Sequence, residues 1–107
     1  MDVGEVRAYA EAFARAVASE DADLVASYLL PARAADIMEV LEAIPRPVVK
    51  TATLMVTVVS AELHGDERKQ EFVSIIEFSG RKGTVLLSCR WTTDDARVTI
   101  RLAQIVP

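Results

Sequence analysis

Side chains that could perform catalysis or bind a metal are few in this sequence and lie far apart. His64 is the single histidine, and Asp66 and Glu67 beside it belong to a polar cluster that is typical of a turn. A histidine acts as a general base when a second group orients it, and here a turn is the favoured interpretation. Cys89 is the single cysteine, so neither an intrachain disulfide nor a cysteine-based zinc site can form. We therefore predict no catalytic residue and no metal site.

Two further polar pairs also fit turns better than binding sites. Asp94 and Asp95 are adjacent carboxylates, but calcium takes about six to eight oxygen ligands, more than two neighbouring side chains supply. Arg81 and Lys82 lie between two glycines, as expected for the tip of a hairpin. The sequence therefore predicts no cofactor.

Composition and charge exclude several classes of protein. The chain has 107 residues, which fits one domain over residues 1–107, and it is 51% hydrophobic and 26% charged, as in ordinary globular proteins. Its net charge of −4 has the wrong sign for binding a phosphate backbone, so we expect no nucleic acid partner. No apolar run is long enough to span a membrane or resembles a secretory leader, and we expect a cytoplasmic protein.

Hydrophobic spacing predicts three helices in the first part of the chain. Apolar residues recur every three or four positions from Val3 to Val17, which indicates a helix of about 16 residues. Asp21 can cap a second, short helix, whose expected buried side chains are Leu24, Val25, Tyr28 and Leu29. A third helix begins at Pro31 and runs to Ile44, and we expect Pro45 and Pro47 to turn the chain into extended structure.

The remaining residues favour strands. Segments rich in Val, Ile and Thr predict strands at 51–63, 69–79, 84–92 and 97–106, joined by short connections. Consecutive strands with short connections pair as an antiparallel meander. The predicted fold is α+β, with three N-terminal helices packed on one face of a curved four-stranded meander.

Alternation along the strands assigns their residues to two faces. We place one set on the side that the helices cover: Phe72, Ser74, Ile76, Phe78, Val85, Leu87, Cys89, Trp91, Val98, Ile100, Leu102 and Gln104. The opposite face mixes charge with branched aliphatic side chains, including Val73, Ile75, Leu86, Arg90, Arg101 and Ile105. A soluble monomer seldom exposes such a patch, which suggests a homodimer through this face. The alternative is that the patch belongs to a second small core.

The order of these elements resembles the nuclear transport factor 2-like superfamily, which includes SnoaL-like cyclases, ketosteroid isomerases and scytalone dehydratase. The resemblance rests on the opening stretch AYAEAFARAVASEDADLVASYLL, on the long strands that follow this stretch, and on the final RVTIRLAQIVP. The resemblance covers nearly the whole chain and implies a cone-shaped, cystatin-like fold with an apolar pocket at one end. It also implies dimerisation through the outer sheet face.

The resemblance and the predicted inner face together suggest a ligand pocket lined by Tyr9, Phe13, Tyr28, Phe72, Ser74, Cys89, Trp91 and Gln104. The chain departs from the catalytic members in two respects. Only residues 30–33 separate the second and third helices, so a strand pair that carries an acid in those members is missing. Phe13 occupies the position of a tyrosine that contacts the substrate in the isomerases, and the predicted inner faces contain no carboxylate.

Three functional hypotheses follow. The favoured one is a non-catalytic domain that binds a small apolar ligand or acts as a dimerisation module. The second is an isomerase, cyclase or dehydratase in which Tyr28, Cys89 or Gln104 positions the substrate, and one of Glu62, Glu71 or Glu77 points inward as the acid or base. The third is an adaptor that binds another protein through its sheet edge or through acidic helix residues such as Glu39 and Glu42.

Overall fold

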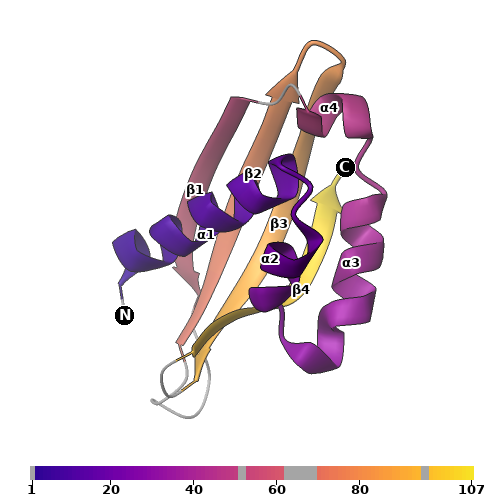
Figure 1. Cartoon of the computed structure of the whole chain (residues 1–107). Helices are drawn as coiled ribbons and strands as arrows, with labels where there is room; N and C mark the ends of the chain where they lie inside the picture. The colour runs from indigo at the N-terminus through magenta and orange to yellow at the C-terminus, as the bar shows by residue number, and fades with distance from the viewer. Residues whose placement is uncertain (1, 51–52, 62–69, 95–96) are drawn as a thin grey trace.

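The α+β fold class is confirmed by the computed structural model, which describes residues 2–50, 53–61, 70–94 and 97–107 (Figure 1). In these residues the chain forms four α-helices, one turn of 3-10 helix and four strands. The elements are α1 (Val3–Ala18), α2 (Ala22–Ser27), the 3-10 turn Pro31–Arg33, α3 (Ala34–Glu42), α4 (Arg46–Lys50), β1 (Thr53–Ala61), β2 (Gln70–Gly80), β3 (Gly83–Asp94) and β4 (Arg97–Val106). None of these helices is both long and apolar enough to cross a membrane.

The helices lie on one face of the sheet. Figure 1 shows α1 crossing in front of the strands, with α3 alongside β4 and α4 near the end of the hairpin between β2 and β3. Their buried side chains and the inner face of the sheet form one core, which includes Phe13, Ile37, Phe78 and Trp91. In the described part of the chain, no helix covers the opposite face, so the sheet has one buried and one open face.

The starts of the first two helices follow from their capping residues. Asp2 Oδ1 accepts a hydrogen bond from the Glu5 backbone N–H at 2.9 Å, and Asp21 Oδ1 accepts one from the Leu24 N–H at 3.2 Å. The predicted first helix and the predicted cap at Asp21 are confirmed. Leu24 was expected to be buried but is 44% exposed, because a helix of six residues turns only one narrow side, carried by Val25, toward the core.

The expectation of extended structure after Pro45 was wrong. The chain instead forms the short helix α4, and the Pro45 carbonyl accepts hydrogen bonds from the Val48 and Val49 N–H groups at 3.0 and 3.2 Å. Pro47 is the second residue of α4, where a proline is tolerated because the first N–H groups of a helix have no partner within the helix. Val48 and Val49 are 4% and 6% exposed, and their burial against the sheet favours the helix.

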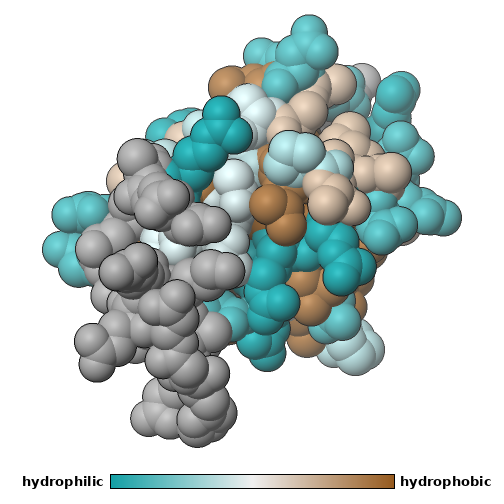
Figure 2. All heavy atoms as spheres, turned by 90° about the horizontal axis from the view of Figure 1, so that it is seen from below, coloured by the Kyte–Doolittle hydropathy of each residue, from teal (hydrophilic) through white to brown (hydrophobic). Residues whose placement is uncertain are grey.

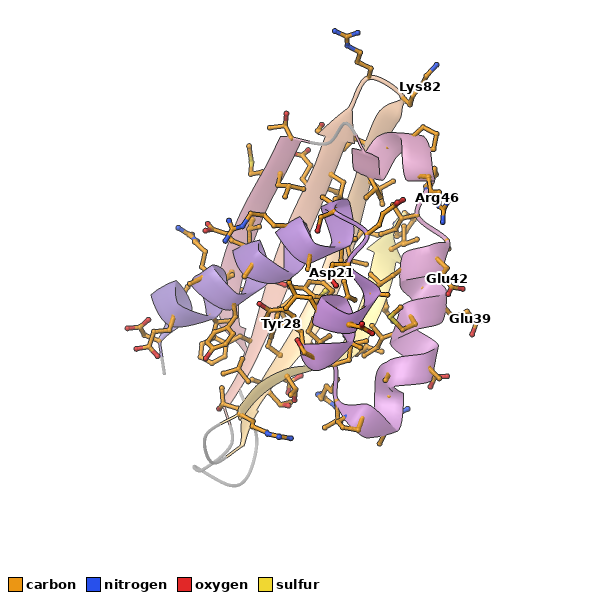
Figure 3. The ribbon with its side chains drawn as sticks, in the orientation of Figure 1. Asp21, Tyr28, Glu39, Glu42, Arg46 and Lys82 are labelled. Atoms are coloured by element: carbon orange, nitrogen blue, oxygen red, sulfur yellow. The ribbon has the colours of Figure 1, made fainter. Side chains whose placement is uncertain are left out.

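The four strands form the predicted antiparallel meander in the order β1-β2-β3-β4. At the hairpin between β2 and β3, Arg81 and Lys82 form the tip, as predicted, and Lys82 lies at the upper end of the molecule in Figure 3. Gly83 has a φ of 133°, a conformation that a residue with a Cβ rarely adopts. The glycine therefore permits this tight connection.

A β-bulge in β4 reverses the predicted alternation after Ile100. Trp91 pairs with Ile100 and Arg90 pairs with Leu102, so Arg101 is an extra residue without an opposite partner in β3. Since the side-chain period of a strand is two, one inserted residue moves every later side chain to the other face. The predictions for Leu102 and Gln104 as inner residues and for Ile105 as an outer residue were therefore wrong. Ala103 and Ile105 instead pair with the inner residues Cys89 and Leu87.

The two edges of the sheet differ. The β4 edge is partly paired, because the Leu30 N–H donates to the Ile100 carbonyl and the Ile100 N–H donates to the Tyr28 carbonyl, each at 2.8 Å. In the described residues, β1 pairs only with β2, which leaves its outer edge without a strand partner.

Candidate functional site

Most of the residues predicted to line a pocket pack together in the core. Phe13, Tyr28 and Trp91 meet edge to face, with ring centroids 5.8, 5.9 and 6.3 Å apart. Phe13 and Trp91 are completely buried, and Phe72 is 3% exposed. The indole Nε1 of Trp91 donates a hydrogen bond to Ser74 Oγ at 2.8 Å, which satisfies the polar atom of this large core side chain.

The remaining predicted pocket residues have three different environments. Cys89 is fully buried, and desolvation raises the pKa of its thiol to about 12 even though a hydrogen bond with Ser74 acts in the opposite direction. The thiol is therefore protonated at neutral pH and is not a nucleophile. Tyr9 is 40% exposed on α1, and Gln104 is exposed on the open face of the sheet. Gln104 thus lies apart from the other predicted pocket residues.

An open cavity lies elsewhere, among the helices. It is an open groove of about 440 Å³ between the end of α1 and helices α2, α3 and α4. Its lining is mostly apolar, with three charged residues: Val17, Glu20, Ala22, Val25, Met38, Leu41, Glu42, Ile44, Arg46 and Val49. None of the eight predicted pocket residues contributes to it. Sequence reasoning missed this groove because the apolar residues that form it also fit the ordinary buried sides of helices.

The charged residues of the groove are held by the ends of the helices. Glu20 follows the C-cap Ser19 of α1 and has a φ of 57°, in the left-handed region that favours glycine. Backbone hydrogen bonds of 3.1 Å from Glu20 to Val17 and from Asp21 to Ala16 close the end of α1. Arg46 Nε lies 3.6 Å from Glu20 Oε1, and Figure 3 shows Arg46 on α4 and Glu42 on α3 on the same side of the molecule. The Arg46 side chain is 81% exposed, so this ion pair is weak.

The open face of the sheet carries most of the predicted dimer residues. The strand register places Val73, Ile75, Leu86 and Arg90 on this face, and Arg101 reaches it from the bulge. Ile105 is the exception and lies on the helix side. The most exposed apolar side chains of the face are Met55 (63%), Val59 (55%) and Leu102 (41%). In Figure 2, which views one end of the molecule, apolar surface lies directly beside strongly hydrophilic surface.

Glu71 forms the centre of a charged cluster on this face. Its Oε1 accepts hydrogen bonds from Arg90 at 2.9 Å and from Arg101 at 2.6 Å, and its side chain is only 5% exposed. Burial raises the pKa of Glu71, but the hydrogen bonds and positive charges of Arg101 and Arg90 outweigh this effect, and the pKa lies below its ordinary value. An ionised carboxylate held by two guanidinium groups is suited to fixing structure. Glu71 does not line the helix groove, so it is not placed to act as an acid or base there.

The other titratable residues form no metal site within the described residues. No group of three or more His, Cys, Asp or Glu side chains is arranged there to hold an ion. The predicted turn of His64, Asp66 and Glu67 lies outside the described residues, as do Glu62 and Asp95.

Comparison with known proteins identifies no relative of this chain. No protein-family model, curated protein or solved structure matches the chain.

Proposed function

We propose that this domain binds a small apolar molecule in the groove between its helices and is not itself an enzyme. The observation that carries the proposal is a groove of about 440 Å³, which lies apart from the packed rings of Phe13, Tyr28 and Trp91. Ligand sites in proteins are usually concave, mainly apolar and about 300 to 1,000 Å³ in volume. The groove has this size and this type of lining.

A titration followed at methionine methyl groups tests the proposal. Met38 lines the groove, whereas Met55 is exposed on the open sheet face, so a protein labelled with ¹³C at the methionine methyls contains both a reporter and an internal control. We expect 1-octanol to shift the Met38 signal saturably and to leave Met55 unchanged. A response at Met55 without one at Met38 would overturn the proposal.

Two matched variants of α2 test whether the groove itself is occupied. Ala22 lines the groove and Ala26 does not, although both are exposed residues of the same helix. Ala22→Trp places an indole where the ligand would lie and should weaken 1-octanol binding at least tenfold. Ala26→Trp should leave binding within about twofold of the original protein. Equal binding by both variants would place the ligand elsewhere.

We further infer that the chain is a short member of the nuclear transport factor 2-like superfamily with its cone-shaped fold. Support comes from the element order, in which a long first helix crosses one face of an antiparallel meander. Membership would support the open sheet face as a dimer surface, because the resemblance implies dimerisation through the outer face. An experimental structure of this chain would test the membership.

A second candidate function, homodimerisation through the open sheet face, is favoured by the arrangement of charge on that face. Glu77 lies on this face six residues from Glu71 along β2, or about 20 Å at the rise of a strand. Arg90 and Arg101 outweigh Glu71 at one end of the face, whereas Glu77 lies toward the other end, near the hairpin tip that Arg81 and Lys82 form. A two-fold axis perpendicular to the strands would bring the positive end of each copy against Glu77 of its partner.

The size of the open face also suits a dimer. Four strands about 4.8 Å apart and about ten residues long cover roughly 600 Å². A standard interface buries about 800 Å² on each partner, and the lower limit is about 600 Å². Two copies could therefore bury enough area if most of the face takes part.

Sedimentation equilibrium tests this dimer. Ile75→Lys puts a charge on the open face and should raise the dimer dissociation constant at least tenfold, whereas Ala35→Lys adds the same charge on the exposed side of α3 and should not change it. Glu77→Lys should also weaken the dimer by removing the opposite charge. A monomer at 100 µM in the original protein would contradict the dimer hypothesis.

A further inference from the structure

We propose that the groove selects ligands that carry a cationic head group on an apolar body, with Glu20 and Glu42 binding the head group. This inference rests on the proposed binding function and adds the class of ligand. The argument combines the charges of the groove, the helix ends that meet there and the backbone conformation of Glu20.

The charge of the groove is net negative. Its charged lining residues are Glu20, Glu42 and Arg46, and Arg46 is paired with Glu20 at 3.6 Å. Glu42 has no ion-pair partner among the described residues. The surrounding segment is also acidic, since residues 1–47 contain nine Asp and Glu against four Arg. A ligand with a positive group is therefore attracted to the groove, and an anion is repelled.

The two longest helices near the groove add to this potential. α1, with 16 residues, and α3, with nine, both end at the groove, where Val17 and Glu42 line it. The C-terminus of a helix has a partial negative charge because the dipoles of its peptide units add along the helix axis. α2 and α4 begin at the groove and act in the opposite direction, but they contain only six and five residues.

Glu20 occupies a position where glycine would be more stable. Glu20 follows the C-cap of α1 and has a φ of 57°. A residue with this left-handed backbone conformation after a helix is usually glycine, because a Cβ is strained there. The Glu20 side chain lines the groove, and its ion-pair partner among the described residues is the highly exposed Arg46. Such an exposed ion pair adds little stability and is easily exchanged for a ligand cation. A residue that is strained and adds little to the stability of the fold is consistent with a role in ligand binding.

Three ligands with the same chain length test the selection by charge. Octylammonium, 1-octanol and octanoate are titrated separately into the ¹³C-methionine protein below their micelle concentrations, with Met38 as reporter. We expect octylammonium to bind about threefold to tenfold more tightly than 1-octanol, and octanoate to bind more weakly than both. Binding of all three with equal affinity would overturn this inference and leave the proposed function intact. Binding of none would overturn both.

Variants assign the selection to particular side chains. Glu20→Gln and Glu42→Gln should each reduce the preference for octylammonium over 1-octanol about threefold. Glu39→Gln removes a carboxylate from α3 that does not line the groove, and should change the preference less than twofold. Arg46→Gln should strengthen octylammonium binding. A preference for octanoate that Arg46→Gln abolishes would show that the groove selects anions instead.

Glu20→Gly separates binding from stability. Glycine relieves the left-handed strain, so this variant should raise the melting temperature by about 2 to 6 °C while it reduces the octylammonium preference about threefold. A loss of both stability and preference would indicate that Glu20 has a structural role.

Discussion

The Glu71 carboxylate is held by Arg90 and Arg101 on the face of the sheet that no described helix covers. Its lowered pKa means that the folded protein binds this proton less readily than the unfolded chain does. The resulting stabilisation is present above the ordinary glutamate pKa of about 4.3 and is lost as the pH falls through the lower pKa of the folded state. Glu71 therefore contributes to the acid sensitivity of the fold.

We expect Glu71→Gln to lower the free energy of unfolding by about 1 to 2 kcal/mol at pH 7, because a neutral amide oxygen replaces the charged acceptor of two hydrogen bonds that are partly screened by solvent. Near pH 3 the difference between variant and original should shrink, since the unfolded chain then takes up a proton at Glu71 that the folded protein binds less readily. Urea unfolding at both pH values measures this. A difference that is equal at both would show that the charge of Glu71 is not responsible.

The hydrogen bond between Ser74 and Trp91 joins two completely buried side chains. We expect Ser74→Ala to lower the free energy of unfolding by about 1 to 3 kcal/mol, because the indole N–H would remain buried without an acceptor. Ser88→Ala, at a half-buried position on the open face, should cost less than about 0.5 kcal/mol. Denaturant titration of both variants measures the difference, and equal losses would show that the bond adds little.

Individual buried side chains were predictable from the sequence when the element around them was regular. Phe72, Ser74 and Trp91 alternate along unbroken strands, and all are buried as expected. The Trp91 to Ser74 bond was not predictable, because it joins residues 17 positions apart and depends on the register of β2 against β3. The Glu71 cluster depends in the same way on β2, β3 and β4 meeting in one register.

Among the elements, β1 has an exposed edge with few protective features. In the described residues its outer edge has no strand partner, and residues 53–61 contain no charge and no proline. Natural edge strands usually carry such residues because they prevent pairing with other chains. The β4 edge is better protected, since residues 28–30 hydrogen-bond to Ile100.

We expect Thr57→Lys, in the middle of β1, to reduce aggregation on heating at least twofold, because a charge on an unpaired edge opposes pairing with another chain. Thr99→Lys places the same charge on the same sheet face but on β4, and should have a smaller effect. Light scattering during a thermal ramp measures both. If the two variants behave alike, the charge itself and not the β1 edge is the cause.

At the scale of elements, the bulge at Arg101 and the helix α4 could not be predicted from the sequence. The alternation in residues 97–106 continues through the bulge, so the sequence pattern contains no sign of an extra residue. The bulge is decided by how β4 pairs with β3. Likewise, Val48 and Val49 favour a strand in isolation, but their burial beneath the sheet hairpin favours a helical turn.

For the whole molecule, a ligand that binds only the folded groove must stabilise the protein. At ten times its dissociation constant, a ligand adds about 1.4 kcal/mol, which corresponds to a rise in melting temperature of about 5 to 10 °C for a domain of this size. We expect octylammonium to produce this rise in the original protein and in Ala26→Trp, but not in Ala22→Trp. Differential scanning calorimetry measures the shift, and an equal rise in all three proteins would place the stabilising site outside the groove.

The sequence by itself determined the α+β class, the order of the first three helices and the antiparallel meander. These features depend on periodicity, capping residues and turns, which act between residues close in the chain. Only the tertiary structure decided the bulge, α4, the packing of the aromatic core and the groove, because each depends on contacts between segments distant in sequence. The groove is formed where the end of α1 meets α2, α3 and α4, so its shape depends on the angles at which these helices pack.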